Sequence, residues 1–252
     1  MSSITGIAVK IVLRRKVMNN KKPCMKITLT DTKPSIFESK VGGLGYIPHD
    51  KNFPTDSNGN QLRLLAQIEC EKIQLDGFMK TGLLQFWIMN DDNCGFVFHN
   101  PTNQDGFRVI YYPEIDKTVT NEEIESKFVK NEYDDDPYYF PVFRECGMSF
   151  EKYENRFIEY SEEIPEEVYE EVYDENAGHK VGGYPVFAQS DPRIDEEMLE
   201  NYDFLLFQLD TDDIYGKYLV MWGDCGVGNF FINSEKLKQC DFSDVLYNWD
   251  CC

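Results

Sequence analysis

The sequence lacks a hydrophobic run long enough to cross a membrane. No stretch approaches the ~20 apolar residues that a membrane-spanning helix needs. The first apolar segment, residues 4–13, is interrupted by Lys10 and followed by Arg14, Arg15 and Lys16. We therefore expect no transmembrane helix, no signal peptide and no membrane partner.

The sequence is also poor in the residue patterns that bind metals or form disulfide frameworks. It has 3 histidines, none spaced at i, i+4 from another histidine or a cysteine, which is the usual spacing of zinc ligands on a helix. Its 8 cysteines include no C-x-x-C pair, and the chain is far larger than the small secreted domains that depend on disulfides. We expect free thiols in a reducing, cytoplasmic compartment, and no metal or other cofactor.

Basic residues are scarce relative to acidic ones. The chain has 25 Lys and Arg against 45 Asp and Glu, a formal net charge of −20. Binding to a nucleic-acid backbone requires clusters of Lys and Arg, so we expect no nucleic-acid partner. Such a charge attracts a basic protein partner, although the simpler interpretation is a surface that only maintains solubility. The sequence leaves the oligomeric state open.

Aromatic and aliphatic residues are abundant, at 42% hydrophobic residues with 18 Phe and 15 Tyr, so the chain folds. Three short blocks recur in the same order and at nearly constant spacing. The pairs of blocks are 40–43 with 180–183, 64–68 with 205–209, and 82–88 with 226–232. This recurrence predicts an internal duplication.

The recurring blocks have the length and composition of β-strands. Residues 63–68 and 204–209 are apolar at nearly every position, which predicts strands that are covered on both faces. Gln67 and Gln208 would then be buried and hydrogen-bonded. The adjoining Gly-Gly pairs predict a backbone φ that residues with a Cβ rarely adopt.

We predict an α+β class, namely a β-rich mixed fold with internal duplication, in which an acidic helical connector joins two related β-sheet halves. The expected parts are a poorly defined segment 1–22, a first β-rich repeat 23–118, the connector 119–176 and a second repeat 177–252, forming one compact unit.

Two helices are predicted in the connector. Thr120 followed by Glu123 has the capping-box pattern and predicts a helix ending near Val129. Residues 159–175 include nine acidic residues and no Lys or Arg, and their apolar residues recur every four positions. This predicts an amphipathic helix over about 165–174, whose acidic face is either only solvated or binds a partner.

The candidate site residues are polar side chains in or beside the repeated blocks. If the two halves meet at a seam, these side chains could converge there, and the cations could hold an anionic ligand. The alternative is that they tie strands together through buried salt bridges and hydrogen bonds. The candidates are Lys40, Arg63, Gln67, Lys180, Asp191, Arg193, Gln208, Asp224 and Asn229.

No catalytic set is evident. Cys225 lies in a glycine-rich turn where a nucleophile could be displayed, but no histidine can be assigned to it as a base. We interpret this turn as a tight connection between strands.

Several motifs together resemble the YwqG-like family of bacterial proteins of unknown function, over roughly residues 23–252. The motifs are Ser39–Gly43, Phe53–Asp56, Leu62–Ile68, Gly82–Phe86, Asn100–Thr102, Gln189–Arg193 and Met221–Ile232. The sequence departs from the family before residue 23, where a helix is usual, and at Gln189–Asp191, where an acidic residue is common in the middle.

The resemblance implies a mixed α and β fold with internal duplication, and no established activity, cofactor or catalytic residues. Members of such families are suspected of serving as immunity proteins beside secreted bacterial toxins. We therefore expect a non-catalytic cytosolic binding protein. The alternative is a small-molecule-binding protein or enzyme that holds an anionic ligand between the halves and uses Asp224 or Cys225 for chemistry.

Overall fold

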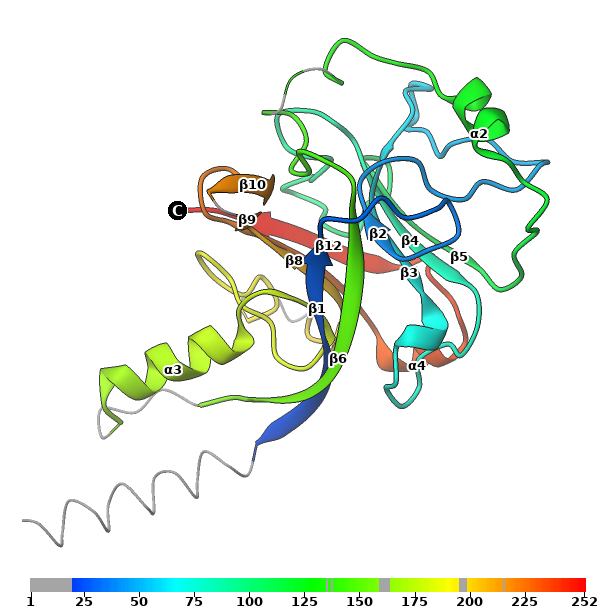
Figure 1. The fold of residues 1–252 in the computed structure, drawn as a ribbon. Coiled ribbons are helices and arrows are strands. Elements are labelled where there is room, and N and C mark those ends of the chain that lie inside the picture. Colours follow the sequence, from blue (N-terminus) through cyan, green and yellow to red (C-terminus); the bar gives the residue numbers. More distant parts are fainter. Residues whose placement is uncertain (1–19, 135, 137, 159–163, 195–198, 215) are drawn as a thin grey trace, which may run out of the picture.

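A single large antiparallel sheet organises the chain (Figure 1). The computed structural model describes residues 20–134, 136, 138–158, 164–194, 199–214 and 216–252. The sheet has 10 strands in the order β12-β11-β8-β7-β1-β6-β2-β3-β4-β5. Their bounds are β1 Lys21–Thr30, β2 Lys40–Val41, β3 Arg63–Glu69, β4 Leu83–Ile88, β5 Phe107–Tyr112, β6 Cys146–Arg156, β7 His179–Gly182, β8 Phe204–Asp210, β11 Val227–Ile232 and β12 Val245–Asp250. A separate hairpin pairs β9 (Asp212–Ile214) with β10 (Lys217–Val220).

The sheet curves until its two ends pack against each other. Phe86 of β4 lies with its ring centroid 4.8 Å from that of Phe207 on β8 and 5.0 Å from that of Phe230 on β11. Phe107 of β5 contacts Tyr247 of β12 at 5.2 Å. The main hydrophobic core is therefore enclosed between the opposite ends of one nearly closed sheet.

The predicted α+β class is wrong, because the protein is mostly β. The described residues contain three α-helices, all short: α2 (Asn121–Lys127), α3 (Glu166–Asn176) and α4 (Ser234–Lys238). The predicted helical connector also contains β6, which lies in the middle of the sheet. Its sequence alternates buried and exposed positions and carries charged side chains, so a search for apolar runs does not find it.

The two halves share the sheet by exchanging their first strands. β1 precedes β2 in the chain but pairs with β7, and β6 precedes β7 but pairs with β2. β1 and β6 pair with each other along ten positions, from Lys21–Arg156 to Thr30–Gly147. The seam between the halves is therefore this central strand pair.

The repeated blocks occupy matching places on either side of β1 and β6. Lys40 pairs with Gln67, which pairs with Gln85. On the other side Lys180 pairs with Gln208, which pairs with Asn229. β3 and β8 are almost fully buried strands, as the apolar runs predict. We call these two rows of paired residues the first and second ladders.

The Gly-Gly pairs adopt the left-handed backbone that the sequence predicts. Gly42 and Gly43 have φ values of 65° and 68°, and Gly182 and Gly183 both have 75°. A Cβ on Gly183 would lie 2.0 Å from Asn155 Oδ1. Conformation and close packing both require glycine there.

Two helices begin and end close to their predicted bounds. Thr120 Oγ1 accepts a hydrogen bond from the Glu123 amide at 3.2 Å and caps α2. α3 lies against β6, far from α2 in Figure 1, and buries Val172. Among the described residues, no helix combines the length and hydropathy needed to span a bilayer.

Candidate functional site

The two buried glutamines of the first ladder hold loops in place. Gln67 Oε1 accepts from the Tyr46 amide at 2.9 Å, and its Nε2 donates to the carbonyls of Ile36 and Glu38. The carboxamide thus satisfies three backbone groups. Gln85 donates to both the Tyr46 carbonyl and Gln67 Oε1, each at 2.8 Å.

The second ladder repeats this arrangement. Gln208 Oε1 accepts from the Val186 amide at 2.9 Å, and its Nε2 donates to the carbonyls of Asn176 and Gly178. Asn229 donates to the Val186 carbonyl at 2.9 Å. Gln67, Gln208 and Asn229 are each 0% exposed, so these predicted site residues are held within the fold.

Three of the four predicted cations are paired with carboxylates. Lys40 Nζ lies 2.7 Å from Glu145 Oε1. Arg63 binds both oxygens of Asp134, at 2.5 and 2.6 Å. Such paired, largely buried charges are a structural arrangement that is costly to break.

Arg193 is paired as well, with a residue that the sequence analysis also selected. Its guanidinium binds both oxygens of Asp191, at 2.8 and 2.6 Å. The same group lies over the Phe231 ring, 4.0 Å from the centroid. This bidentate, stacked geometry fixes the guanidinium in place.

Lys180 is the exception. It is 0% exposed and its Nζ donates to the Asn176 carbonyl, but no carboxylate in the described part of the chain forms an ion pair with it. Burial lowers the pKa of Lys180 to about 7. Its titratable neighbours include the thiol of Cys24, whose pKa burial raises, and the carboxylate of Asp210.

The exchanged strands explain why the two lysines differ. β6 runs beside β2, so that Glu145, just before β6, meets Lys40. β1 runs beside β7, where Lys26 pairs with Lys180 and Cys24 is the nearby β1 residue that raises the pKa of Lys180. A thiol therefore stands near the second lysine where a carboxylate neutralises the first.

The predicted site residues do not converge on one cavity. Asp191 and Arg193 line one hollow, and Arg63 lines another on the first half. Asp224 is exposed on the turn between β10 and β11, where Cys225 Sγ lies 3.6 Å from its Oδ1.

The larger of these hollows, which we call the α3 groove, has a volume of about 1060 Å³. Its walls are formed by α3, the two residues after β6 and residues between 183 and 194, together with Lys22, Asp203 and Leu205. Three of its lining side chains are apolar or aromatic yet strongly exposed, namely Phe157 at 48%, Tyr173 at 51% and Ile194 at 76%. Clustered exposed apolar side chains rimmed by polar residues are typical of interaction surfaces.

α3 presents carboxylates to the groove. Glu166, Glu170 and Asp174 recur every four residues and line it, and none of them has an ion-pair partner within the described residues. Glu171 and Glu175 instead bind Arg156, which raises the pKa of that guanidinium. One acidic row of the helix is therefore neutralised by β6, while the other faces the groove.

A family model matches residues 39–251, under the description DUF1963, a domain of unknown function. The chain belongs to the DUF1963 family. No curated protein matches the chain. The family match begins after β1, although β1 forms half of the central strand pair of this DUF1963 protein.

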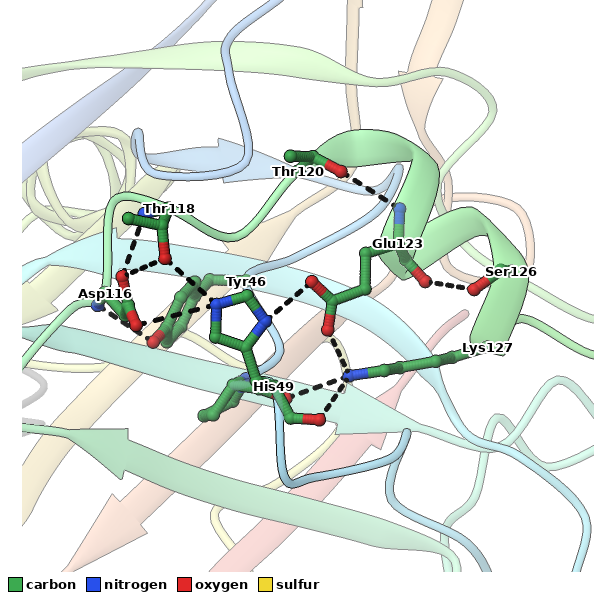
Figure 2. A network of polar contacts seen from close by, with 9 residues as sticks. Tyr46, His49, Asp116, Thr118, Thr120, Glu123, Ser126 and Lys127 are labelled. Atoms are coloured by element: carbon green, nitrogen blue, oxygen red, sulfur yellow. Dashed lines mark hydrogen bonds and ion pairs between the residues drawn. The ribbon is translucent and has the colours of Figure 1, made fainter.

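A polar network on α2 has the order of groups found in nucleophilic triads (Figure 2). Thr118 Oγ1 lies 3.0 Å from His49 Nε2, and His49 Nδ1 lies 2.7 Å from Glu123 Oε2. However, Thr118 donates its hydroxyl proton to Asp116 Oδ1 at 2.6 Å, so the imidazole is not placed to remove that proton. Lys127 binds Glu123 at 3.0 Å, and hydrogen bonding from Lys127 lowers the pKa of Glu123. The network ties the loop at His49 to α2.

Sequence reasoning missed the partners Glu145 and Asp134, the buried thiol of Cys24 and the network at His49. Glu145 and Asp134 lie outside the recurring blocks, in the segment for which the sequence predicts a helical connector. The acidic row on α3 could be read from the sequence, but its position beside exposed aromatic residues could not.

Proposed function

We propose that this DUF1963 protein is a non-catalytic binding protein whose α3 groove holds a basic, partly apolar segment of a protein partner. The observation that carries the proposal is the combination of Glu166, Glu170 and Asp174 with exposed Phe157, Tyr173 and Ile194 in one hollow. A basic segment would complement the carboxylates, and its apolar side chains would cover the exposed rings.

The net charge of −20 supports the same partner class, because it favours encounter with basic proteins. An anionic ligand held by Lys40, Arg63, Lys180 and Arg193 has less support, since three of these cations already have carboxylate partners. Eight free cysteines among the described residues support a reducing, cytoplasmic location. We extend the family assignment to the bacterial YwqG-like proteins, with immunity to a basic toxin as one form of the binding role.

Three labelled synthetic peptides of equal length would test the groove. One combines lysine with leucine and phenylalanine, one replaces lysine with glutamate, and one replaces the apolar residues with serine. We expect only the first to bind with high affinity in fluorescence anisotropy, and its affinity to fall as salt increases. Equal binding of all three peptides would contradict the proposal.

Substitutions locate the site. Glu166→Gln with Glu170→Gln, and separately Tyr173→Ala, should each weaken binding about tenfold, because rim charges and aromatic anchors contribute about 1 kcal/mol or more. The matched controls are Glu122→Gln with Glu125→Gln on α2 and Phe98→Ala, which is 67% exposed outside the groove-lining set. If the controls weaken binding as much as the groove variants, the peptide binds elsewhere.

A further inference from the structure

A second cluster of chemically reactive side chains lies at the turn between β10 and β11. Asp224, Cys225 and Cys252 offer ligand atoms that all lie within 4.8 Å of one another, and all three residues are exposed. The two thiol sulfurs are 2.6 Å apart. None of these residues lines the α3 groove.

The fold brings these residues together from distant parts of the chain. β11 pairs with β12 from Val227–Asp250 onward, so the residues just before β11 meet the residues just after β12. The turn is closed by a hydrogen bond from the Gly226 amide to the Trp222 carbonyl at 2.8 Å. Gly223, with φ 58°, approaches Cys251 too closely for a Cβ.

The segment that carries Cys252 is anchored. The Asp250 carboxylate accepts from the amides of Ala188 and Gln189 at 3.0 and 2.8 Å. Gln189 Nε2 also donates to the Cys251 carbonyl at 2.7 Å. The backbone on both sides of the cluster is thus positioned before any ligand arrives, which reduces the entropic cost of binding.

We propose that Cys225, Cys252 and Asp224 form a zinc-binding site with two thiolates, one carboxylate and an open fourth position for water or another ligand. Sulfur and carboxylate oxygen are both ordinary zinc ligands, and three protein ligands plus an open position is an established arrangement. Zinc binds thiolates, so it must displace the thiol protons, and its affinity rises with pH.

Zinc titration of the reduced protein in competition with a chromophoric chelator tests this site. We expect one bound zinc per chain, released protons and tighter binding at higher pH. Cys225→Ser and Cys252→Ser should each lower the affinity at least tenfold, with a smaller loss for Asp224→Asn. Cys240→Ser is the matched control, because Cys240 is also exposed but is not part of the cluster, and it should leave the affinity unchanged.

Cobalt binding provides an independent measurement, because thiolate ligation gives a charge-transfer absorption that carboxylates do not. That absorption should appear in the wild-type protein and in Cys240→Ser, and should be lost in the Cys225→Ser, Cys252→Ser double variant. The proposal is overturned if the reduced wild-type protein binds no stoichiometric zinc, or if Cys225→Ser binds it as tightly. Recovery of the two residues only as a disulfide, without metal binding under reducing conditions, would identify a redox pair instead.

Discussion

Replacing Lys180 with methionine should make the protein more stable near neutral pH. The Lys180 amine is fully buried without an ion-pair partner among the described residues, and burial lowers its pKa to about 7, against ~10.4 in an unfolded chain. Between these values the unfolded chain holds a proton that the folded protein has released. Folding therefore becomes more favourable as pH rises from about 7, at about 1.4 kcal/mol per pH unit.

In the wild-type protein alone, the rise in stability with pH is opposed above about pH 8.5. Burial raises the pKa of Cys70 and of Cys94 to about 12, whereas an unfolded thiol ionises near 8.5. A group with a raised folded pKa loses its contribution as pH rises past the unfolded value, so these thiols oppose the gain from Lys180. Both thiols are present in wild type and in Lys180→Met, so their effect cancels in the difference.

Urea unfolding of both proteins at several pH values measures that difference. Lys180→Met should exceed wild type by a few kcal/mol at pH 7, and the advantage should shrink by about 2 kcal/mol by pH 8.5. Methionine matches the lysine side chain as far as Cε and removes the buried amine. A variant less stable than wild type at pH 7, or a difference that does not change with pH, would refute this reasoning.

Further substitutions test other parts of the fold. Lys40→Met should lower the free energy of unfolding by about 2 kcal/mol, because Glu145 Oε1 loses its ion-pair partner, Lys40 Nζ, at 2.7 Å. An unchanged urea midpoint would contradict this prediction. Gln67→Leu leaves the Tyr46 amide and two carbonyls unsatisfied and should cost about 3 kcal/mol or more, measured against the exposed control Gln74→Leu. Gly183→Ala should lower the thermal unfolding temperature far more than Gly59→Ala. Both glycines have a positive φ, but a Cβ on Gly183 would clash with Asn155, whereas Gly59 has open space around it.

The strands and the buried glutamines could be predicted because their signals are local. β3 and β8 are short apolar runs, and a glutamine inside such a run must be hydrogen-bonded. The cap at Thr120 has the same local character. The recurrence of the blocks also indicated which residues lie at matching places in the two ladders.

The fold class and the ion pairs could not be predicted, because they depend on the exchange of β1 and β6 between the two halves. β6 keeps a polar face and lies in an acidic stretch, so it looks like part of a helical connector. The partner of Lys40, Glu145, is 105 positions away in sequence. Only the pairing of β6 with β2 brings the two together, and long-range pairing leaves no periodic signal in one sequence.

Comparison of the two halves indicates why the groove is on the second. Gly43, Leu44 and Leu64 line a hollow of about 410 Å³ on the first half, and their counterparts Gly183, Tyr184 and Leu205 line the α3 groove of about 1060 Å³.

On the first half, Asp134 approaches the ladder and binds Arg63, and Glu145 neutralises Lys40. On the second half, Phe204 begins β8 as Arg63 begins β3, and Cys24 lies near Lys180. Four charged residues that line the first hollow, Arg63, Asp134, Arg144 and Glu145, are therefore paired within the fold, whereas Glu166, Glu170 and Asp174 have no ion-pair partner among the described residues. An unneutralised acidic wall beside exposed rings costs little in water and is stabilised by a basic, apolar occupant, so we place the proposed binding role in the second half.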